Sequence, residues 1–379
     1  MKTQLHEHLE EEKENKEEKI QEAMKKTIRD HENAQWISPS NMEKGIDYEA
    51  IADSTLLLIV TYNRADYLKK CLSFITMYHP AKGFPMLISQ DGFDQRVQQT
   101  VEEFQNTHSH SFSVKHIHHP KSGHAQNGYF ALSEHYKFAL SEAFSDPSIQ
   151  RVIVLEEDLQ ISVDFFEYFL ATSPLLDDPS QHLLAVSAWN DNGFSDRVKR
   201  PEFVFRSDFF PGLGWMLGRS VWEELSQKWP RAYWDDWLRE DNQRQQRHIL
   251  HPEISRTFHF GTKGTSNAQY GDYLNRIKLN DQFVHFSTMD LTYLDIDSWE
   301  KTYLEPIYTL PILRNKDEVK TTSYSQVRVE YSGNQHFEQR AREFGIMDNI
   351  KANVPRTAYK GVVSFWFSGV LGEFQYHIT

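Results

Sequence analysis

Short apolar runs alternate with helical patterns from residue 53 onward, and this alternation constrains the fold more than any other feature of the sequence. The expected strands lie in "STLLLIVTYNR", "FPMLISQDG" and "RVIVLEED", and the expected helices lie in "ADYLKKCLSFITMYH" and "GYFALSEHYKFALSEAF". A chain that alternates strand and helix in this way is expected to form an α/β fold, with a mostly parallel, Rossmann-like sheet carrying helices on both faces.

The chain has 379 residues, enough for one large domain and a smaller one. We expect a helical extension over residues 1–52, the α/β domain over 53–290 and a small α+β domain over 291–379. Residues 1–35 are rich in Glu and Lys at helical spacings, which favours a solvated helix; a coiled-coil arm is the alternative. In the last domain, "YSQVRVEYSG" and "GVVSFWFSGV" have the pattern of strands.

Composition excludes several classes of protein. The net charge of −13 argues against a nucleic-acid partner, because phosphate binding needs a basic surface. No apolar run approaches the roughly 20 residues of a transmembrane helix, and the N-terminus lacks the apolar core of a signal peptide. The single cysteine, Cys71, cannot form an intramolecular disulfide, which suits a reducing compartment, and we expect it to be buried. We therefore expect a cytoplasmic protein without a transmembrane segment.

Three adjacent carboxylates, Glu156, Glu157 and Asp158, directly follow an apolar strand. Ligands of open parallel sheets bind beyond the carboxyl ends of the strands. Neighbouring anions that are partly removed from water repel one another, so we expect a positively charged group to bind beside them. Oxygen ligands suit Mn²⁺ or Mg²⁺, whose coordination is often completed by substrate phosphates. The plain alternative is a solvated strand end and turn, with Ser162 capping the next helix.

Two other expected strands also end in polar groups, Arg64 in "TYNR" and Asp91 in "SQDG". A guanidinium is well shaped for phosphate, and a carboxylate accepts hydrogen bonds from a ribose hydroxyl or a base N–H. These groups at one sheet edge indicate a nucleotide with its metal. The sequence contains neither a G-x-x-x-x-G-K-[ST] motif nor a G-x-G-x-x-G motif after a strand, which disfavours a P-loop ATPase and an NAD-binding protein.

Several long segments, in the same order along the chain, resemble glycosyltransferase family 13. They are "SQD" (89–91), "EHYKFAL" (134–140), "EEDLQISVDFFEYF" (156–169), "SAWNDNG" (187–193), "DFFPGLGW" (208–215), "KWPRAYWDDW" (228–237), "PEISRT" (252–257), "FGTKGTS" (260–266) and "VPRTAYKGVVSF" (354–365). The resemblance implies a GT-A fold and an inverting, Mn²⁺-dependent transfer of N-acetylglucosamine from UDP-N-acetylglucosamine to a mannose-type acceptor, with a β-1,2 linkage.

The resemblance also implies roles for individual residues. Asp158 matches the metal ligand, Glu156 a donor-sugar contact and Glu157 a residue near the ribose. The family pattern has Asp at the middle position, and the longer Glu157 resembles the protein O-mannose branch of the family. The sequence therefore leaves open whether the acceptor is the mannose of an N-glycan or a protein O-mannose. The other implied donor contacts are Arg64, Asp91 and His135 for the pyrophosphate and uracil, Leu213 and Trp234 for the sugar, and Ser266 for the phosphates.

Asp235 in "WDDW" is the expected general base. An inverting displacement needs one carboxylate to take the proton of the acceptor hydroxyl, and the family pattern places it on Asp235. We expect Asp235 to be confined against Trp234, and Asp236 to be a structural residue at a helix N-terminus. Residues 260–272 hold three glycines and small polar residues; we expect a lid over the donor rather than an ordinary surface loop.

Three further features are open to a plain and a functional interpretation. The histidines of "HSHSFSVKHIHHPKSGH" favour a loop near the nucleotide over a zinc site, since no Cys accompanies them and their spacing matches no common zinc pattern. Trp189 is either a core residue or, with the turn 190–193, part of the sugar site. The chain also lacks the cysteines and the membrane anchor of the family's Golgi members, which favours a cytosolic variant.

The alternative functions are another UDP-sugar transferase, a UDP-sugar phosphohydrolase and a catalytically silent binding protein.

Overall fold

The structure is a computed structural model that describes residues 45–80, 82–108, 113–120, 128–261, 271–319, 324–369 and 372–379. The expected helix over residues 1–35 and most of the expected lid, including Ser266, lie outside these ranges. Residues 48–379 form one unit, and the domain boundaries expected from the sequence stay a prediction. Within the described ranges, no helix combines the length and the apolar character needed to cross a bilayer.

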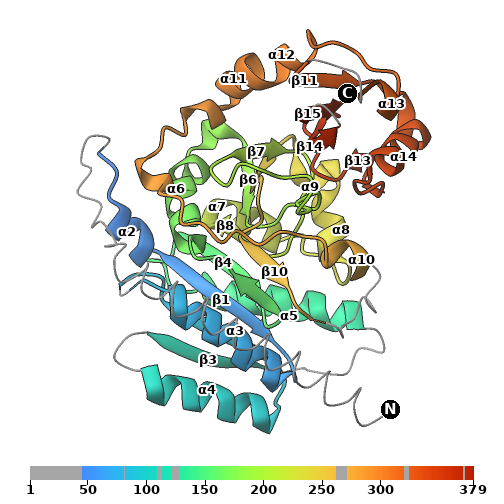
Figure 1. Ribbon diagram of the computed structural model, residues 1–379. Coiled ribbons are helices and arrows are strands. Elements are labelled where there is room, and N and C mark those ends of the chain that lie inside the picture. The colour runs from blue at the N-terminus through green and yellow to red at the C-terminus, as the bar shows by residue number, and fades with distance from the viewer. Residues whose placement is uncertain are drawn as a thin grey trace, which may run out of the picture. The chain divides into compact units, whose positions relative to one another are not determined.

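A central mixed sheet with flanking helices organises most of the described chain (Figure 1). Its first half contains α2 (Tyr48–Asp53), β1 (Thr55–Thr61), α3 (Ala65–Tyr78), β2 (Met86–Asp91), α4 (Gln95–His108), β3 (Val114–His119), α5 (Gly128–Ala143), β4 (Arg151–Glu156) and β5 (Leu159–Ile161). Its second half contains α6 (Phe165–Asp177), β6 (Leu183–Ser187), β7 (Val204–Ser207), β8 (Trp215–Gly218), α7 (Arg219–Ser226), α8 (Trp234–Arg239), α9 (Asp241–Arg244), β9 (His248–Pro252) and β10 (Thr257–His259).

The strand order in the main sheet is β3-β2-β1-β4-β8-β6-β9-β7. β3, β2, β1 and β4 are parallel, as the strand–helix alternation predicts. β8 then runs antiparallel to both β4 and β6, and β7 runs antiparallel to β9. The expected mostly parallel α/β sheet is confirmed, and each of its antiparallel pairs involves β7 or β8. A separate two-stranded pair joins β10 to β5.

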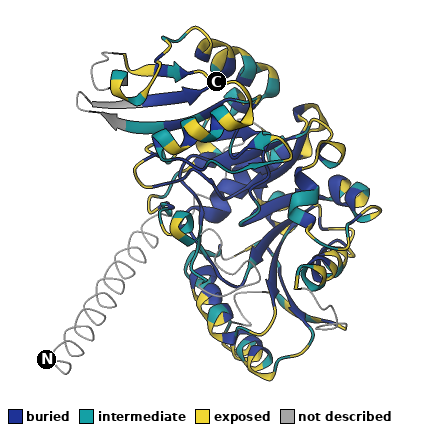
Figure 2. Cartoon of the chain, turned by 90° about the vertical axis from the view of Figure 1, so that its right-hand side faces the viewer, coloured by how far each residue is buried: buried dark blue, intermediate teal, exposed yellow. Residues whose placement is uncertain are grey.

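Both faces of the sheet are buried, which explains the continuous apolar runs of its central strands (Figure 2). On one face, Leu58 and Val60 of β1 pack in a cluster with residues of α5, α7 and α8. The alternate residues of β1 point to the opposite face and are equally buried. There α6 covers β8, where the Ser173 hydroxyl lies 3.6 Å from the sulfur of Met216.

The C-terminal part of the chain builds a small sheet of its own, in the order β11-β15-β14. Its elements are α10 (Gly271–Leu274), α11 (Ile296–Trp299), α12 (Glu305–Ile307), α13 (Lys316–Val319), β11 (Gln326–Val329), α14 (Gly333–Phe344), β12 (Ile350–Lys351), β13 (Val354–Pro355), β14 (Val363–Gly369) and β15 (Gly372–Ile378). The strands expected in "YSQVRVEYSG" and "GVVSFWFSGV" are confirmed as β11 and β14. Phe337 and Phe344 of α14 pack on this sheet in a separate apolar cluster.

The turn after Trp189 connects the C-terminal part to the main sheet. Trp189 is a buried core residue, and its indole N–H donates to Asp191 at 3.2 Å. Asp191 forms an ion pair with Arg356 at 3.0 Å, and the Asn192 side chain accepts from the backbone N–H of Met347 at 2.9 Å. The core interpretation of Trp189 therefore holds, and the turn 190–193 binds the C-terminal segment rather than lining the cavity described below.

A fully buried ion pair fixes the connection between β5, α6 and β10. Asp164 accepts from the Arg256 guanidinium at 2.9 and 3.2 Å, and both side chains are completely shielded from solvent. The other Asp164 oxygen accepts from Ser162 at 2.7 Å and from Asn280 at 2.9 Å. Ser162 therefore donates to Asp164 and does not cap α6, so the cap offered in the plain alternative is not formed.

Replacing Asp164 with Ala should lower the free energy of unfolding by about 3–5 kcal/mol, because it leaves the Arg256 charge buried and unpaired. Urea denaturation followed by circular dichroism measures this loss. The matched control is Glu338→Ala, which removes an exposed partner of Arg342 and should change stability by only about 0–1 kcal/mol. Equal effects of the two substitutions would contradict the structural role of the buried pair.

Candidate active site

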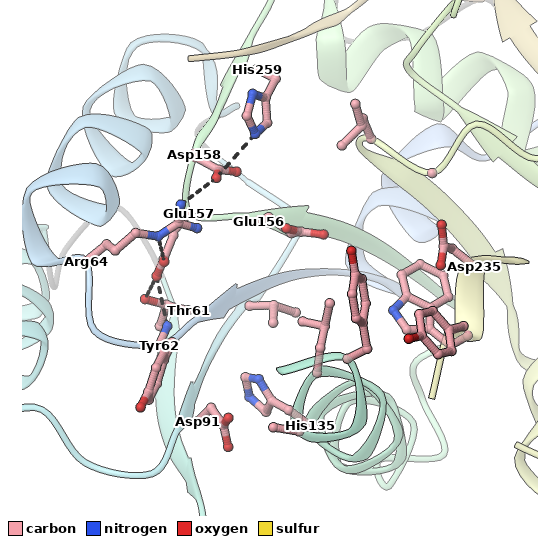
Figure 3. Close-up of a pocket in the computed structure, with 18 of the residues that line it drawn as sticks. Thr61, Tyr62, Arg64, Asp91, His135, Glu156, Glu157, Asp158, Asp235 and His259 are labelled. Carbon is pink, nitrogen blue, oxygen red and sulfur yellow. Dashed lines mark hydrogen bonds and ion pairs between the residues drawn. The ribbon is translucent and has the colours of Figure 1, made fainter. Parts of the chain in front are cut away.

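A cavity of ≈ 670 Å³ opens at the carboxyl ends of β1, β2 and β4 (Figure 3). Every site residue expected from the sequence, except Ser266, lines this one cavity. They are Arg64, Asp91, His135, Glu156, Glu157, Asp158, Leu213, Trp234 and Asp235. The strand-end argument therefore located the cavity correctly, although the roles of the individual residues stay predictions.

Glu157 binds Arg64 and the end of β1 at the wall of the cavity. One carboxylate oxygen accepts from the Thr61 hydroxyl and, at 2.9 Å, from the backbone N–H of Tyr62. The other oxygen accepts from Arg64 Nε at 2.5 Å. Both oxygens are thus engaged by the protein, and the side chain is 3% exposed. In this arrangement Glu157 positions Arg64, while its expected ribose contact stays a prediction.

Asp158 is a buried carboxylate with unused acceptor capacity. Its Oδ2 atom lies 2.8 Å from Arg64 Nη1 and 3.4 Å from His259 Nε2, whereas its buried Oδ1 atom has no hydrogen-bond partner among the described residues. Burial alone would raise the pKa of Asp158, but the hydrogen bonds and positive charges of His259 and Arg64 lower it below the ordinary value. Burial alone would lower the pKa of His259, and Asp158 raises it instead.

Glu156 faces the middle of the cavity and has a single phenol partner. The Tyr136 hydroxyl donates to Glu156 at 2.7 Å, and the Tyr136 ring stacks on Trp234 at 4.3 Å between centroids. Trp234 in turn stacks on Trp215 and Trp229, so its indole belongs to the aromatic core as well as to the cavity wall. Burial, followed by the negative charge of Asp158, raises the pKa of Glu156 to about 7.

Asp91 and His135 lie on the wall formed by β2 and α5. Asp91 accepts from His119 Nδ1 at 2.8 Å, and His119 stacks on the ring of His135. His135 Nε2 lies 2.9 Å from the Ser89 hydroxyl, and burial lowers the pKa of His135 to about 3, so its ring is neutral at physiological pH. Within the described residues, no group of three or more His, Cys, Asp or Glu side chains is arranged to hold zinc.

Asp235 lies across the cavity from Asp158, with Glu156 between them in the view of Figure 3. Its Oδ2 atom accepts from Arg239 Nη1 at 2.9 Å, and Arg239 is itself held by the carbonyl of Phe210 at 2.8 Å. The Asp235 side chain is 42% exposed, so the expected confinement against the buried Trp234 is wrong. The reason is that α8 directs the indole into the core and leaves the next side chain beside Arg239.

Asp236 has the structural role expected of it. It accepts from Arg239 at 2.7 Å and from Lys351 of β12 at 3.0 Å, so it joins α8 to the C-terminal part of the chain.

A glycine turn brings Leu213 to the cavity. Gly214 has a φ of +83°, and a Cβ atom at this position would lie 2.6 Å from the Thr257 methyl group. The Thr257 hydroxyl donates to the carbonyl of Leu213 at 2.6 Å, which ties the turn to β10. The turn therefore requires glycine both for its conformation and for its close approach to β10.

Sequence reasoning missed three residues that contact the predicted site: Tyr136, Arg239 and His259. His119 belongs to the histidine segment expected to form a loop near the nucleotide; it lies on the strand β3 instead and contacts Asp91. Aromatic side chains on helices usually pack in the core and basic ones usually face solvent, so Tyr136 and Arg239 gave no distinct signal of a functional site. His259, in contrast, directly precedes the expected lid, and a histidine at that position was a usable signal. Cys71, expected to be buried, is completely shielded, and burial raises the pKa of its thiol.

A model of the GNT-I family matches residues 2–372 of the sequence. The chain belongs to the GNT-I family. Alpha-1,3-mannosyl-glycoprotein 2-beta-N-acetylglucosaminyltransferase of Arabidopsis thaliana is 40% identical over 319 residues, which cover 82% of this chain and 70% of that protein. The family resemblance expected from the motifs is therefore confirmed, and with it the class of enzyme, a glycosyltransferase of the N-acetylglucosaminyltransferase type. The observed sheet agrees with the expected GT-A type α/β fold.

Solved structures resemble this GNT-I family member only in part. TarS of S. aureus in complex with UDP has a TM-score of 0.38 and 14% identity, with 54% of this chain and 59% of that chain covered. Mannosyltransferase PcManGT from Pyrobaculum calidifontis, in complex with GDP-Man and Mn²⁺, has a TM-score of 0.33 and 15% identity, with 45% and 46% covered. The chain spans about half the length of these proteins, and similarities of this size carry no argument about ligands.

The raised pKa of Glu156 predicts a pH-dependent loss of stability. Since its pKa rises from 4.5 to about 7 on folding, the folded protein binds more protons in this window, and stability falls as the pH rises through it. Glu156→Gln removes this titration. As the pH rises from 4.5 to 7, the free energy of unfolding of the variant should therefore increase by on the order of 2 kcal/mol relative to that of the unsubstituted protein.

Urea unfolding at pH 4.5, 6 and 7.5, without metal or nucleotide, measures this difference. Glu134→Gln, on the exposed side of α5, is the matched control and should show no such trend. A constant difference between the Glu156→Gln variant and the unsubstituted protein across this range would contradict the prediction.

Proposed function

We propose that this protein transfers N-acetylglucosamine from UDP-N-acetylglucosamine to a mannose-containing acceptor, with inversion and formation of a β-1,2 linkage. Family membership supports the transfer, and the name of the Arabidopsis relative supports the donor sugar, the mannosyl acceptor and the linkage. The observation that carries the proposal is one cavity with Asp158 on one wall and Asp235 on the other. An inverting displacement needs this separation, because donor activation and proton removal occur on opposite sides of the anomeric carbon.

The described residues around Asp158 fit a divalent cation, Mn²⁺ or Mg²⁺. Asp158 Oδ1 is buried and has no hydrogen-bond partner among them, as expected for an oxygen that accepts a cation. A Cβ atom at Gly261 would lie 2.6 Å from Asp158 Oδ2, so glycine keeps the space beside the carboxylate free of a side chain. Asp158 would hold the cation, which when bound supplies positive charge that stabilises the departing UDP.

The remaining walls supply groups that suit a nucleotide sugar. The Arg64 guanidinium, held from below by Glu157, is 27% exposed and offers charged donors to the pyrophosphate. Asp91 and the neutral His135 offer an acceptor and a polar ring to the uracil and ribose. Glu156, Leu213 and Trp234 form the inner wall where the sugar would lie, and we assign them its orientation. Ser266 is assigned a phosphate contact by its position in the family motif.

Asp235 acts as the general base in this proposal. Its exposure of 42% leaves the carboxylate open to an incoming acceptor hydroxyl, and Arg239 holds it in place from the core side. Because Arg239 also binds Asp236, the orientation of α8 fixes where Asp235 points. The acceptor hydroxyl gives its proton to Asp235 as its oxygen bonds to the anomeric carbon, while the bond to the UDP oxygen breaks.

Asp235→Asn should lower kcat by about 10²–10⁴-fold and leave the KM for UDP-N-acetylglucosamine nearly unchanged, because the amide cannot accept the proton. Initial rates of UDP release with a mannoside acceptor measure both constants. Asp236→Asn is the matched control one residue further along α8, and it should retain most of the activity. Full activity of Asp235→Asn would remove Asp235 as the base.

The same assay separates the alternative functions. A transferase releases UDP at full rate only with acceptor, whereas a phosphohydrolase releases free sugar at full rate without it. A binding protein would take up the donor without turnover. Mass spectrometry of products from free mannosides and from O-mannosyl peptides distinguishes the two acceptor classes that Glu157 leaves open. The cytoplasmic location expected from the sequence stays a prediction.

A further inference from the structure

His259 lies at the end of β10, next to the carboxylate to which the metal is assigned. β10 pairs with β5 so that His259 stands opposite Leu159, the residue after Asp158. The next residue reinforces this placement, since the backbone N–H of Phe260 donates to the carbonyl of Asp158 at 3.0 Å. Backbone hydrogen bonds therefore hold the imidazole and the carboxylate together, independently of their side-chain contact.

The distance between the two side chains suits a shared cation. His259 Nε2 lies 3.4 Å from Asp158 Oδ2. Two neighbouring ligand atoms lie about 3.0 Å apart in octahedral coordination with bonds of about 2.1 Å, so the imidazole is within reach of a cation bound by this carboxylate. The His259 side chain is 21% exposed, and it lines the same cavity as Arg64 and Glu156.

Asp158 can bind a cation without losing Arg64, whereas His259 Nε2 gives up its contact with Asp158 Oδ2 when it binds the metal. A carboxylate has about four lone-pair sites, and here the described residues occupy them only at Oδ2, through Arg64 and His259. Arg64 can therefore remain on Asp158, held there by Glu157, while a cation takes another site. Gly261 presents no side chain beside the carboxylate.

We propose that His259 Nε2 is a second protein ligand of the metal, beside Asp158, and that it shifts the preference of the site from Mg²⁺ towards Mn²⁺ and similar transition ions. Imidazole is a good ligand for transition metals, whereas Mg²⁺ prefers oxygen. No third His, Cys, Asp or Glu joins the pair within the described residues. We assign the remaining coordination to UDP phosphates and water. The inference rests on the proposed function, because it takes the metal site at Asp158 as given.

Electron paramagnetic resonance of Mn²⁺ bound to the full chain with UDP tests this assignment directly. A directly bound imidazole nitrogen gives a nitrogen coupling in the electron spin-echo signal of Mn²⁺, and we expect this coupling in the unsubstituted protein. It should vanish in His259→Ala and in His259→Gln, and persist in His285→Ala, which removes an exposed histidine elsewhere. Thermal unfolding checks that each variant is folded.

Affinities measured by titration give a second readout that does not depend on activity. His259→Ala should weaken Mn²⁺ binding at least about tenfold, the low end of what the loss of even an outer-shell partner costs. Mg²⁺ binding should change much less, so the Mn²⁺/Mg²⁺ preference should fall.

The outcomes separate this inference from the proposed function. His259 is not a ligand if the nitrogen coupling is absent from the unsubstituted protein or survives in His259→Ala. If Asp158→Ala abolishes Mn²⁺ binding in the same experiments, the metal site at Asp158 still stands. If the unsubstituted protein binds no Mn²⁺ even with UDP, both the inference and the metal dependence of the proposed function are overturned.

Discussion

The removal of three consecutive carboxylates from water at the end of β4 is the constraint on which the site depends: Glu157 and Asp158 are buried and Glu156 is half-buried. Each carboxylate has different partners. Glu157 accepts from Thr61, Tyr62 and Arg64. Asp158 contacts Arg64 and His259, and Glu156 accepts from the phenol of Tyr136. Within the described part of the chain, Glu157 alone among the three has both oxygens occupied by protein groups. The charge that the protein leaves least compensated therefore lies on Glu156 and Asp158, where a cation and a sugar would bind.

Much of the architecture could be predicted because the relevant physics is local in sequence. The strands β1, β2 and β4 are buried on both faces and therefore read as continuous apolar runs that end in polar residues. Parallel strands place these ends at one sheet edge, so Arg64, Asp91 and Asp158 were brought together without knowledge of any contact. The helix α4 and the strand β3, which follow β2 in the chain, are less apolar than α3 and β2, and the sequence alone did not place them.

The rest of the site depends on contacts between residues far apart in the chain, which a sequence pattern does not encode. The reversal of β8 brings Gly214 against Thr257, and the orientation of α8 buries Trp234 while exposing Asp235. Local reasoning offered Ser162 as a helix cap in the plain alternative, but its hydroxyl donates to Asp164 of the buried Arg256–Asp164 pair instead. The sequence left open whether the turn after Trp189 contacts the sugar, because the partners that it binds lie more than 150 residues away in the chain.

The stacking of Trp234 has a spectroscopic consequence. Its indole lies between Tyr136, which bonds to Glu156, and the rings of Trp215 and Trp229, at centroid distances of 4.3, 5.6 and 5.8 Å. A ligand that changes the charge of Glu156 alters the field on a coupled group of fluorophores. Intrinsic emission can therefore serve as a label-free optical signal of what occupies the cavity.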